Sequence, residues 1–151
     1  MMEKSKLEIG SFLILFMGMY TIIMAILWIF VTDIMFVSDF AYYTGTTYPN
    51  YLVSDPRFAE IYIITKKLVG CILLANGVMI VLINQKVYRK AEKWSWYAIL
   101  IGGGISWSTF IIYKIYIGYI GVSMITFVVG ITLLVIGLAL PAQEILSKKS
   151  S

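Results

Sequence analysis

The chain of 151 residues contains no histidine, one cysteine and three prolines, and only 13% of its residues are charged. Without histidine it lacks the commonest general base and the usual ligand of zinc and haem iron, so no metal ion or other cofactor is expected. The single cysteine, Cys71, excludes a disulfide within the chain. No nucleophile stands beside a base at a spacing typical of catalysis. The sequence therefore predicts a protein that is not an enzyme.

Long uncharged runs dominate the sequence instead. Hydrophobic residues make up 60% of the chain, and the mean hydropathy of +0.89 is too high for a soluble globular protein. At about 1.5 Å per residue, each run is long enough to cross a hydrocarbon core of roughly 30 Å. We predict one all-α domain, residues 1–151, that forms an integral membrane four-helix bundle. Its helices are expected at about 9–32, 57–84, 94–116 and 122–140, with an outer loop at 33–56.

The charges predict how this bundle is oriented. Most of the 12 Lys and Arg residues lie in the two termini and in the connection 85–93, whereas the outer loop is acidic. By the positive-inside rule both termini face the cytoplasm of a multi-pass protein in the cell membrane. Because orientation explains the basic residues, the expected partners are membrane lipids and not nucleic acid.

The outer loop 33–56 is rich in aromatic residues. Thr44–Thr47 and Tyr48–Asn50 are predicted to be turns, and Asp55 followed by Pro56 is typical of a helix start. An aromatic loop of this kind is expected to lie on the bilayer surface as an interfacial flap. The alternative is a loop that closes a ligand cavity at the mouth of the bundle.

Small residues recur at a spacing of seven in every apolar run, which keeps them on one side of a helix. Such positions let helix backbones approach closely. We interpret them as contacts within the bundle, with a dimerisation face as the alternative. The glycines assigned to helix packing are Gly18, Gly70, Gly77, Gly102, Gly130 and Gly137.

A few polar residues within the runs are candidates for ligand binding: Lys66, Lys67, Asp33 and Asn76. Lys66 shares a helix stripe with Gly70 and Gly77, so it is expected to face the bundle and to pair with Asp33, or failing that with Asp39. The alternative for both lysines is snorkelling toward the head groups. Asn76 is expected to hydrogen bond across to another helix, with ligand contact as the alternative. Lys114 is predicted to snorkel.

The segment Tyr88–Ala98 reads Tyr-Arg-Lys-Ala-Glu-Lys-Trp-Ser-Trp-Tyr-Ala and enters the third predicted helix. This basic-Glu-basic-Trp-x-Trp pattern, together with four spans and one long outer loop, resembles small prokaryotic four-helix membrane proteins of the DoxX-like kind. The resemblance implies an architecture and little chemistry.

The residues favour a non-enzymatic accessory or assembly subunit, or a scaffold, that acts by helix packing on another membrane protein or a second copy of itself. The alternative is a binder or transporter of a hydrophobic or amphipathic small molecule or lipid. Its basis is the pair Lys66 and Lys67 beneath an aromatic loop, which suits an anionic head group. A bundle with no cavity beneath the loop would rule this alternative out.

Overall fold

A computed structural model describes residues 5–35 and 37–147, leaving the side chains of Asp33, Val122 and Ser123 undescribed. Within these residues every regular element is a helix, so the predicted all-α fold class is confirmed. The elements in chain order are α1 (Lys6–Phe30), α2 (Thr32–Met35), α3 (Val37–Thr44), α4 (Tyr48–Ser54), α5 (Pro56–Lys86), the 3-10 helix η1 (Tyr88–Lys90), α6 (Lys93–Ile117), α7 (Val122–Ala139) and α8 (Ala142–Ser147).

By length and composition, three helices among the described residues are capable of crossing a membrane. They are Lys6–Phe30, Pro56–Lys90 and Lys93–Ile117. A further apolar stretch, Met124–Ala139, is shorter than these three. The structure thus has three helices of membrane-crossing length and a shorter fourth where the sequence predicted four spans.

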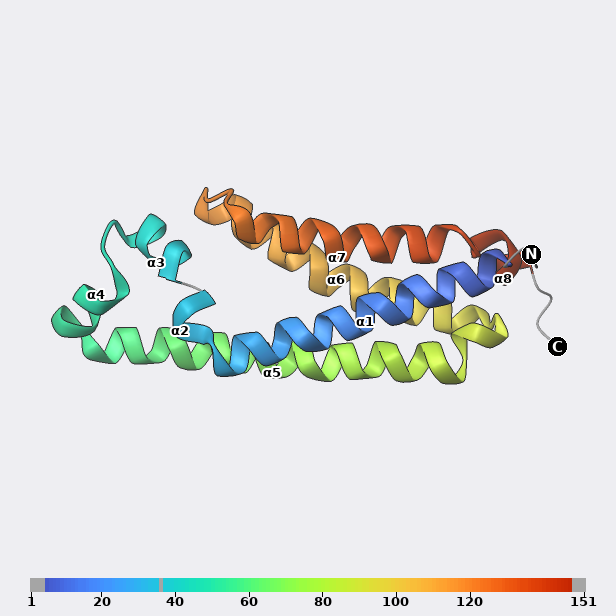
Figure 1. Ribbon diagram of the computed structural model, residues 1–151, viewed down its shortest axis with the longest axis horizontal. Helices are drawn as coiled ribbons and strands as arrows, with labels where there is room; N and C mark the ends of the chain where they lie inside the picture. Colours follow the sequence, from blue (N-terminus) through green and yellow to red (C-terminus); the bar gives the residue numbers. More distant parts are fainter. Residues whose placement is uncertain (1–4, 36, 148–151) are drawn as a thin grey trace.

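The four long helices lie lengthwise in one elongated bundle, with α1 packed against both α5 and α7 (Figure 1). Short helices α2, α3 and α4 gather at one end, where α6 also turns into α7. We call this the loop end. At the opposite end, the terminal end, α1 begins and α8 ends.

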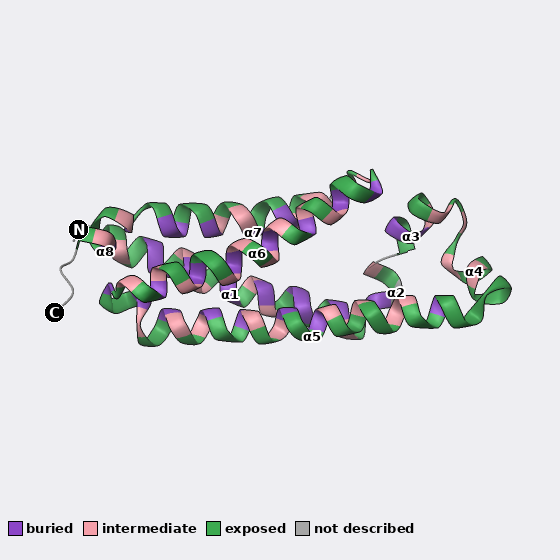
Figure 2. Cartoon of the chain, turned by 180° about the vertical axis from the view of Figure 1, so that it is seen from behind, coloured by how far each residue is buried: buried purple, intermediate pink, exposed green. Residues whose placement is uncertain are grey.

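Exposed residues run along the outside of the bundle, while most buried residues lie on the facing sides of the helices (Figure 2). Many of the exposed residues have large apolar side chains. Exposed examples from the four long helices are Phe12, Ile72, Ile105 and Ile125. A soluble protein rarely presents so much apolar surface, whereas hydrocarbon surroundings favour it. The burial pattern therefore agrees with a membrane protein.

Local sequence explains where the first two long helices begin. Ser5 and Glu8 form a capping box, in which each side chain accepts a hydrogen bond from the other's backbone N–H at 3.2 Å. This cap starts α1 at Lys6, before the predicted start near residue 9. Asp55 accepts a hydrogen bond from the Phe58 N–H at 3.2 Å, and Pro56 opens α5.

Residues 33–56, predicted as a loop with two turns, fold largely into α2, α3 and α4. The chain does bend after Thr44, where Gly45 has a φ of 71°. The turn predicted at Tyr48–Asn50 is wrong, because these residues open α4. Pro49 is tolerated there since the first N–H groups of a helix have no intrahelical partner to lose.

The glycines assigned to packing lie at contacts between helices of this chain. Gly70 and Gly77 face α1, and a Cβ at Gly77 would lie 3.1 Å from the Ile22 backbone nitrogen. The nearest neighbours of the other four are Val81 for Gly18, Asn76 for Gly102, Trp107 for Gly130 and Ile14 for Gly137. The small residues thus hold the bundle itself together, as the internal-packing interpretation requires.

Candidate ligand-binding site

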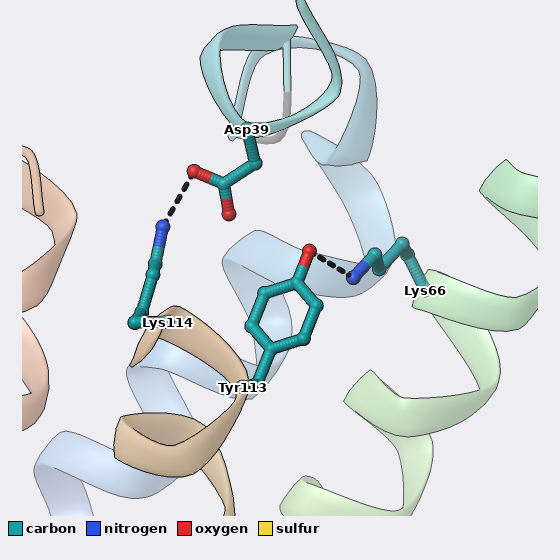
Figure 3. Close-up of polar contacts among 4 residues, drawn as sticks. All are labelled: Asp39, Lys66, Tyr113 and Lys114. Atoms are coloured by element: carbon teal, nitrogen blue, oxygen red, sulfur yellow. Dashed lines mark hydrogen bonds and ion pairs between the residues drawn. The ribbon is translucent and has the colours of Figure 1, made fainter. Parts of the chain in front are cut away.

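A buried ion pair joins the short helices to the bundle at the loop end. Lys114 in the last turn of α6 approaches Asp39 of α3, with 2.5 Å between Nζ and Oδ1, and the two side chains are only 1% and 2% exposed (Figure 3). The Lys114 ammonium also lies 5.2 Å from the ring centre of Tyr119. Burying two charges is costly unless they are paired, so this contact ties α3 to α6.

A second polar contact connects α5 with α6 nearby. The Lys66 ammonium donates a hydrogen bond to the Tyr113 hydroxyl at 2.9 Å (Figure 3). It also lies 4.1 Å from the ring centre of Tyr113 and 5.2 Å from that of Tyr62. Aromatic faces attract a cation, so Lys66 is held toward the bundle as the glycine stripe predicted.

A cavity of about 610 Å³ lies between these two contacts and the short helices. This is within the range of roughly 300–1,000 Å³ typical of small-molecule sites. One part of its wall is polar, formed by Asp39, Thr44 and Lys66 with the Tyr113 ring. The rest is aromatic or apolar and consists of Phe40, Tyr43, Tyr51, Phe58, Tyr62, Tyr116 and Ile117.

Contacts between rings shape the aromatic wall. Phe40 of α3 lies edge-on to Tyr51 of α4 and Tyr62 of α5, with ring centres 5.2 and 5.0 Å apart. Phe58 packs against the same Tyr51 at 5.4 Å. Edge-to-face pairs at such distances are favourable, so three helices hold these rings in fixed positions. The aromatic loop therefore covers a cavity, which was the less favoured of the two sequence interpretations.

Two buried polar atoms of the cavity wall have no hydrogen-bond partner among the described residues, namely Asp39 Oδ2 and the Tyr62 hydroxyl. Asp39 Oδ1 contacts Lys114, whereas the buried Oδ2 receives no hydrogen bond from any residue that the structure describes. In Figure 3 this oxygen points to the side of Tyr113 and Lys66. A buried acceptor without a donor is unfavourable and rare in native proteins. The site is thus polar on one side, apolar on the other, and ready to accept a hydrogen bond.

Of the predicted ligand-binding residues whose side chains the structure describes, Lys66 lines this cavity. Lys67 is exposed and is not among the lining residues. The side chain of Asp33 lies outside the described part of the chain, so its pairing with Lys66 stays a prediction. Asp39, the second predicted partner of Lys66, forms its ion pair with Lys114.

Asn76 lies away from the cavity and has a structural contact. Its side-chain N–H groups donate to the Ser106 hydroxyl at 2.7 Å and to the Gly102 carbonyl at 3.4 Å. The expected hydrogen bond across helices is therefore present, between α5 and α6. A ligand contact at Asn76 stays a prediction.

The interpretation of Lys114 as a snorkelling side chain is wrong, because this lysine is buried and paired. Sequence reasoning also missed Tyr113, which receives the hydrogen bond of Lys66. A signal for Lys114 was present, since it is the only charged residue between Lys93 and Glu144. An isolated charge within an apolar helix usually faces a partner or a cavity.

Another polar cluster lies at the terminal end, and unlike the cavity wall its side chains hydrogen bond to one another. Ser11 and Asn84 exchange two hydrogen bonds of 3.0 and 3.1 Å, and Arg89 Nε donates to the Ser11 hydroxyl at 3.2 Å. These bonds fasten α5 and η1 to α1. Each of the three side chains has a partner, so the cluster is explained by packing.

No protein family, curated protein or solved structure matches the chain. Within residues 5–35 and 37–147, no three His, Cys, Asp or Glu side chains are grouped to hold a metal ion.

Proposed function

We propose that the chain is a four-span protein of the cell membrane that binds an amphipathic molecule in the loop-end cavity. The combination of one polar wall and one aromatic wall carries this proposal. An amphipathic ligand places its polar group against Asp39 and Lys66 and its apolar part against the rings of Tyr51 and Phe58. Concave, largely apolar pockets with a few convergent polar groups are the usual form of small-molecule sites.

The proposed membrane arrangement counts α7 as the fourth span and places both termini in the cytoplasm. Two observations support it. Helix α1 begins and α8 ends at the same end of the bundle, and the connection from α5 through η1 to α6 lies near that end (Figure 1). This connection carries the basic residues Lys86, Arg89, Lys90 and Lys93. Basic residues next to spans favour the cytoplasmic side. The cavity would then open on the outer side, at the depth of the lipid head groups. A DoxX-like ancestry is compatible with this arrangement and stays a hypothesis.

Blocking the cavity tests the binding function. Thr44→Cys in a Cys71→Ser chain places the only thiol in the cavity wall, where a bulky maleimide fills the space. A fluorescent lysophospholipid should bind the unlabelled protein saturably at one site, and labelling at position 44 should abolish that binding. The matched control is the native chain labelled at Cys71, an exposed residue outside the cavity wall, which should bind normally.

Binding that never saturates, or that survives the label at position 44, would contradict the proposal. The alternative, an assembly subunit or scaffold without a ligand, predicts that outcome. Ligand binding is favoured because a cavity lies beneath the aromatic loop, and a protein that acts only by helix packing does not require a cavity.

A further inference from the structure

Hydrogen-bonding roles in the cavity wall restrict which polar group fits there. Asp39 Oδ2 is an acceptor only, and its side chain is 2% exposed with no donor to that oxygen from the described residues. This oxygen is already closed off from water, so a ligand that lies beside it satisfies it only by bringing a donor. Otherwise it leaves a buried carboxylate oxygen unmatched.

Lys66, whose ammonium lines the same cavity, only donates. It already donates to the Tyr113 hydroxyl, and because an ammonium has three N–H donors, an acceptor on the ligand close to its donor would also be favourable there. An ammonium head group supplies a donor for Asp39, but it meets the cations of Lys66 and Lys114 around the same carboxylate. A phosphocholine head group supplies acceptors and no donor.

A hydroxyl group is both a donor and an acceptor. Two neighbouring hydroxyls, as in glycerol or a sugar, satisfy both sides of the cavity at once without adding a cation. We propose, building on the binding function above, that the ligand is a lipid whose head group carries neighbouring hydroxyls. One hydroxyl donates to Asp39 Oδ2, and the oxygen of the next accepts from Lys66 Nζ.

Head-group competition on the native chain tests this inference. Phosphatidylglycerol, a monoglucosyl diacylglycerol and phosphatidylcholine with identical acyl chains each compete against the fluorescent lysophospholipid. The two hydroxyl-bearing lipids should displace the probe at concentrations at least roughly tenfold lower than phosphatidylcholine, the factor expected from one hydrogen bond to a buried charge. Free glycerol and free glucose are tested as competitors in the same assay.

Equal displacement by the three lipids overturns the hydroxyl inference and leaves the binding function standing, because the probe still binds the cavity. A probe that does not bind, or that ignores the label at position 44, overturns the binding function itself. Displacement by free glucose or glycerol at concentrations similar to those of the lipids supports the hydroxyl chemistry and assigns it to a soluble polyol.

Two variants separate the roles of the polar residues. Asp39→Asn replaces one oxygen by an N–H donor, so the preference for hydroxyl-bearing lipids over phosphatidylcholine should fall toward one. Lys66→Met should weaken both lipid classes by similar factors and preserve the preference. The ratio within each variant is the readout, because a purely structural effect lowers both affinities together. The assignment of the hydroxyl donor to Asp39 is contradicted if the preference survives in Asp39→Asn, or if it is lost in Lys66→Met alone. If Asp39→Asn does not fold, the preference of the native chain and that of Lys66→Met still test the inference.

Discussion

Asp39 and Lys114 form a pair whose burial makes each residue depend on the other. Removing one partner of a buried pair typically costs about 3–5 kcal/mol, because the remaining charge stays in a low-dielectric place. Lys114→Met and Asp39→Asn should therefore each lower the thermal stability of the protein in detergent. The double variant should lose less than the sum of the two single losses.

Lys67→Met serves as the matched control for these variants, since Lys67 is an exposed lysine near the same end of the bundle. Its effect should stay within about 0.5 kcal/mol, as for most surface substitutions. Strictly additive losses at Asp39 and Lys114, or a Lys114→Met variant as stable as Lys67→Met, would show that the two side chains do not depend on each other as a buried ion pair does.

At the scale of the elements, the close contact between α1 and α5 depends on glycines, which have no side chain. A Cβ at Gly77 would lie 2.9 Å from the Ile22 side chain and 3.1 Å from its backbone nitrogen, and backbone moves less easily than a flexible side chain. Gly77→Ala should destabilise the bundle by about 1–3 kcal/mol, the usual cost of overpacking. Thermal unfolding in detergent, followed by circular dichroism, measures the loss.

Gly104 in α6 provides the control, because a Cβ there meets nothing within 4 Å. Gly104→Ala should be neutral or stabilising by up to about 1 kcal/mol, since alanine favours helix more than glycine does. If the two alanine variants behave alike, close packing at Gly77 is not what holds α1 against α5.

For the molecule as a whole, the proposed topology is open to a direct test. In a Cys71→Ser background, cysteines at Tyr48 and at Lys90 lie at the loop end and near the terminal end, respectively. A membrane-impermeant thiol reagent added to intact cells should label position 48. Position 90 should react only after the membrane is opened. Labelling of both positions from one side would refute the four-span arrangement.

The sequence by itself determined the helical class and much of the helix layout. In a membrane, the backbone of an apolar run must form its hydrogen bonds within the protein, which only helices and closed barrels achieve. These runs are too long and too continuously apolar for barrel strands, which alternate, so they form helices. The limits follow from local chemistry, as in the capping box at Ser5 and the start of α5 at Asp55 and Pro56. Packing glycines were also predictable, because close approach requires small residues at helical spacing.

Only the tertiary structure decided which polar residues meet. Asp39 and Lys114 are separated by 75 positions, and no local pattern links them. Their pairing depends on where α3 lies relative to the end of α6, and the ring contacts of Phe40 with Tyr51 and Tyr62 hold α3 against α4 and α5. Lys66 was predictable as a residue facing the bundle because helical periodicity indicates on which side of a helix a residue lies. Its hydrogen bond to Tyr113 and the cavity between them were not, since periodicity carries no information about which neighbour lies opposite or how much space remains.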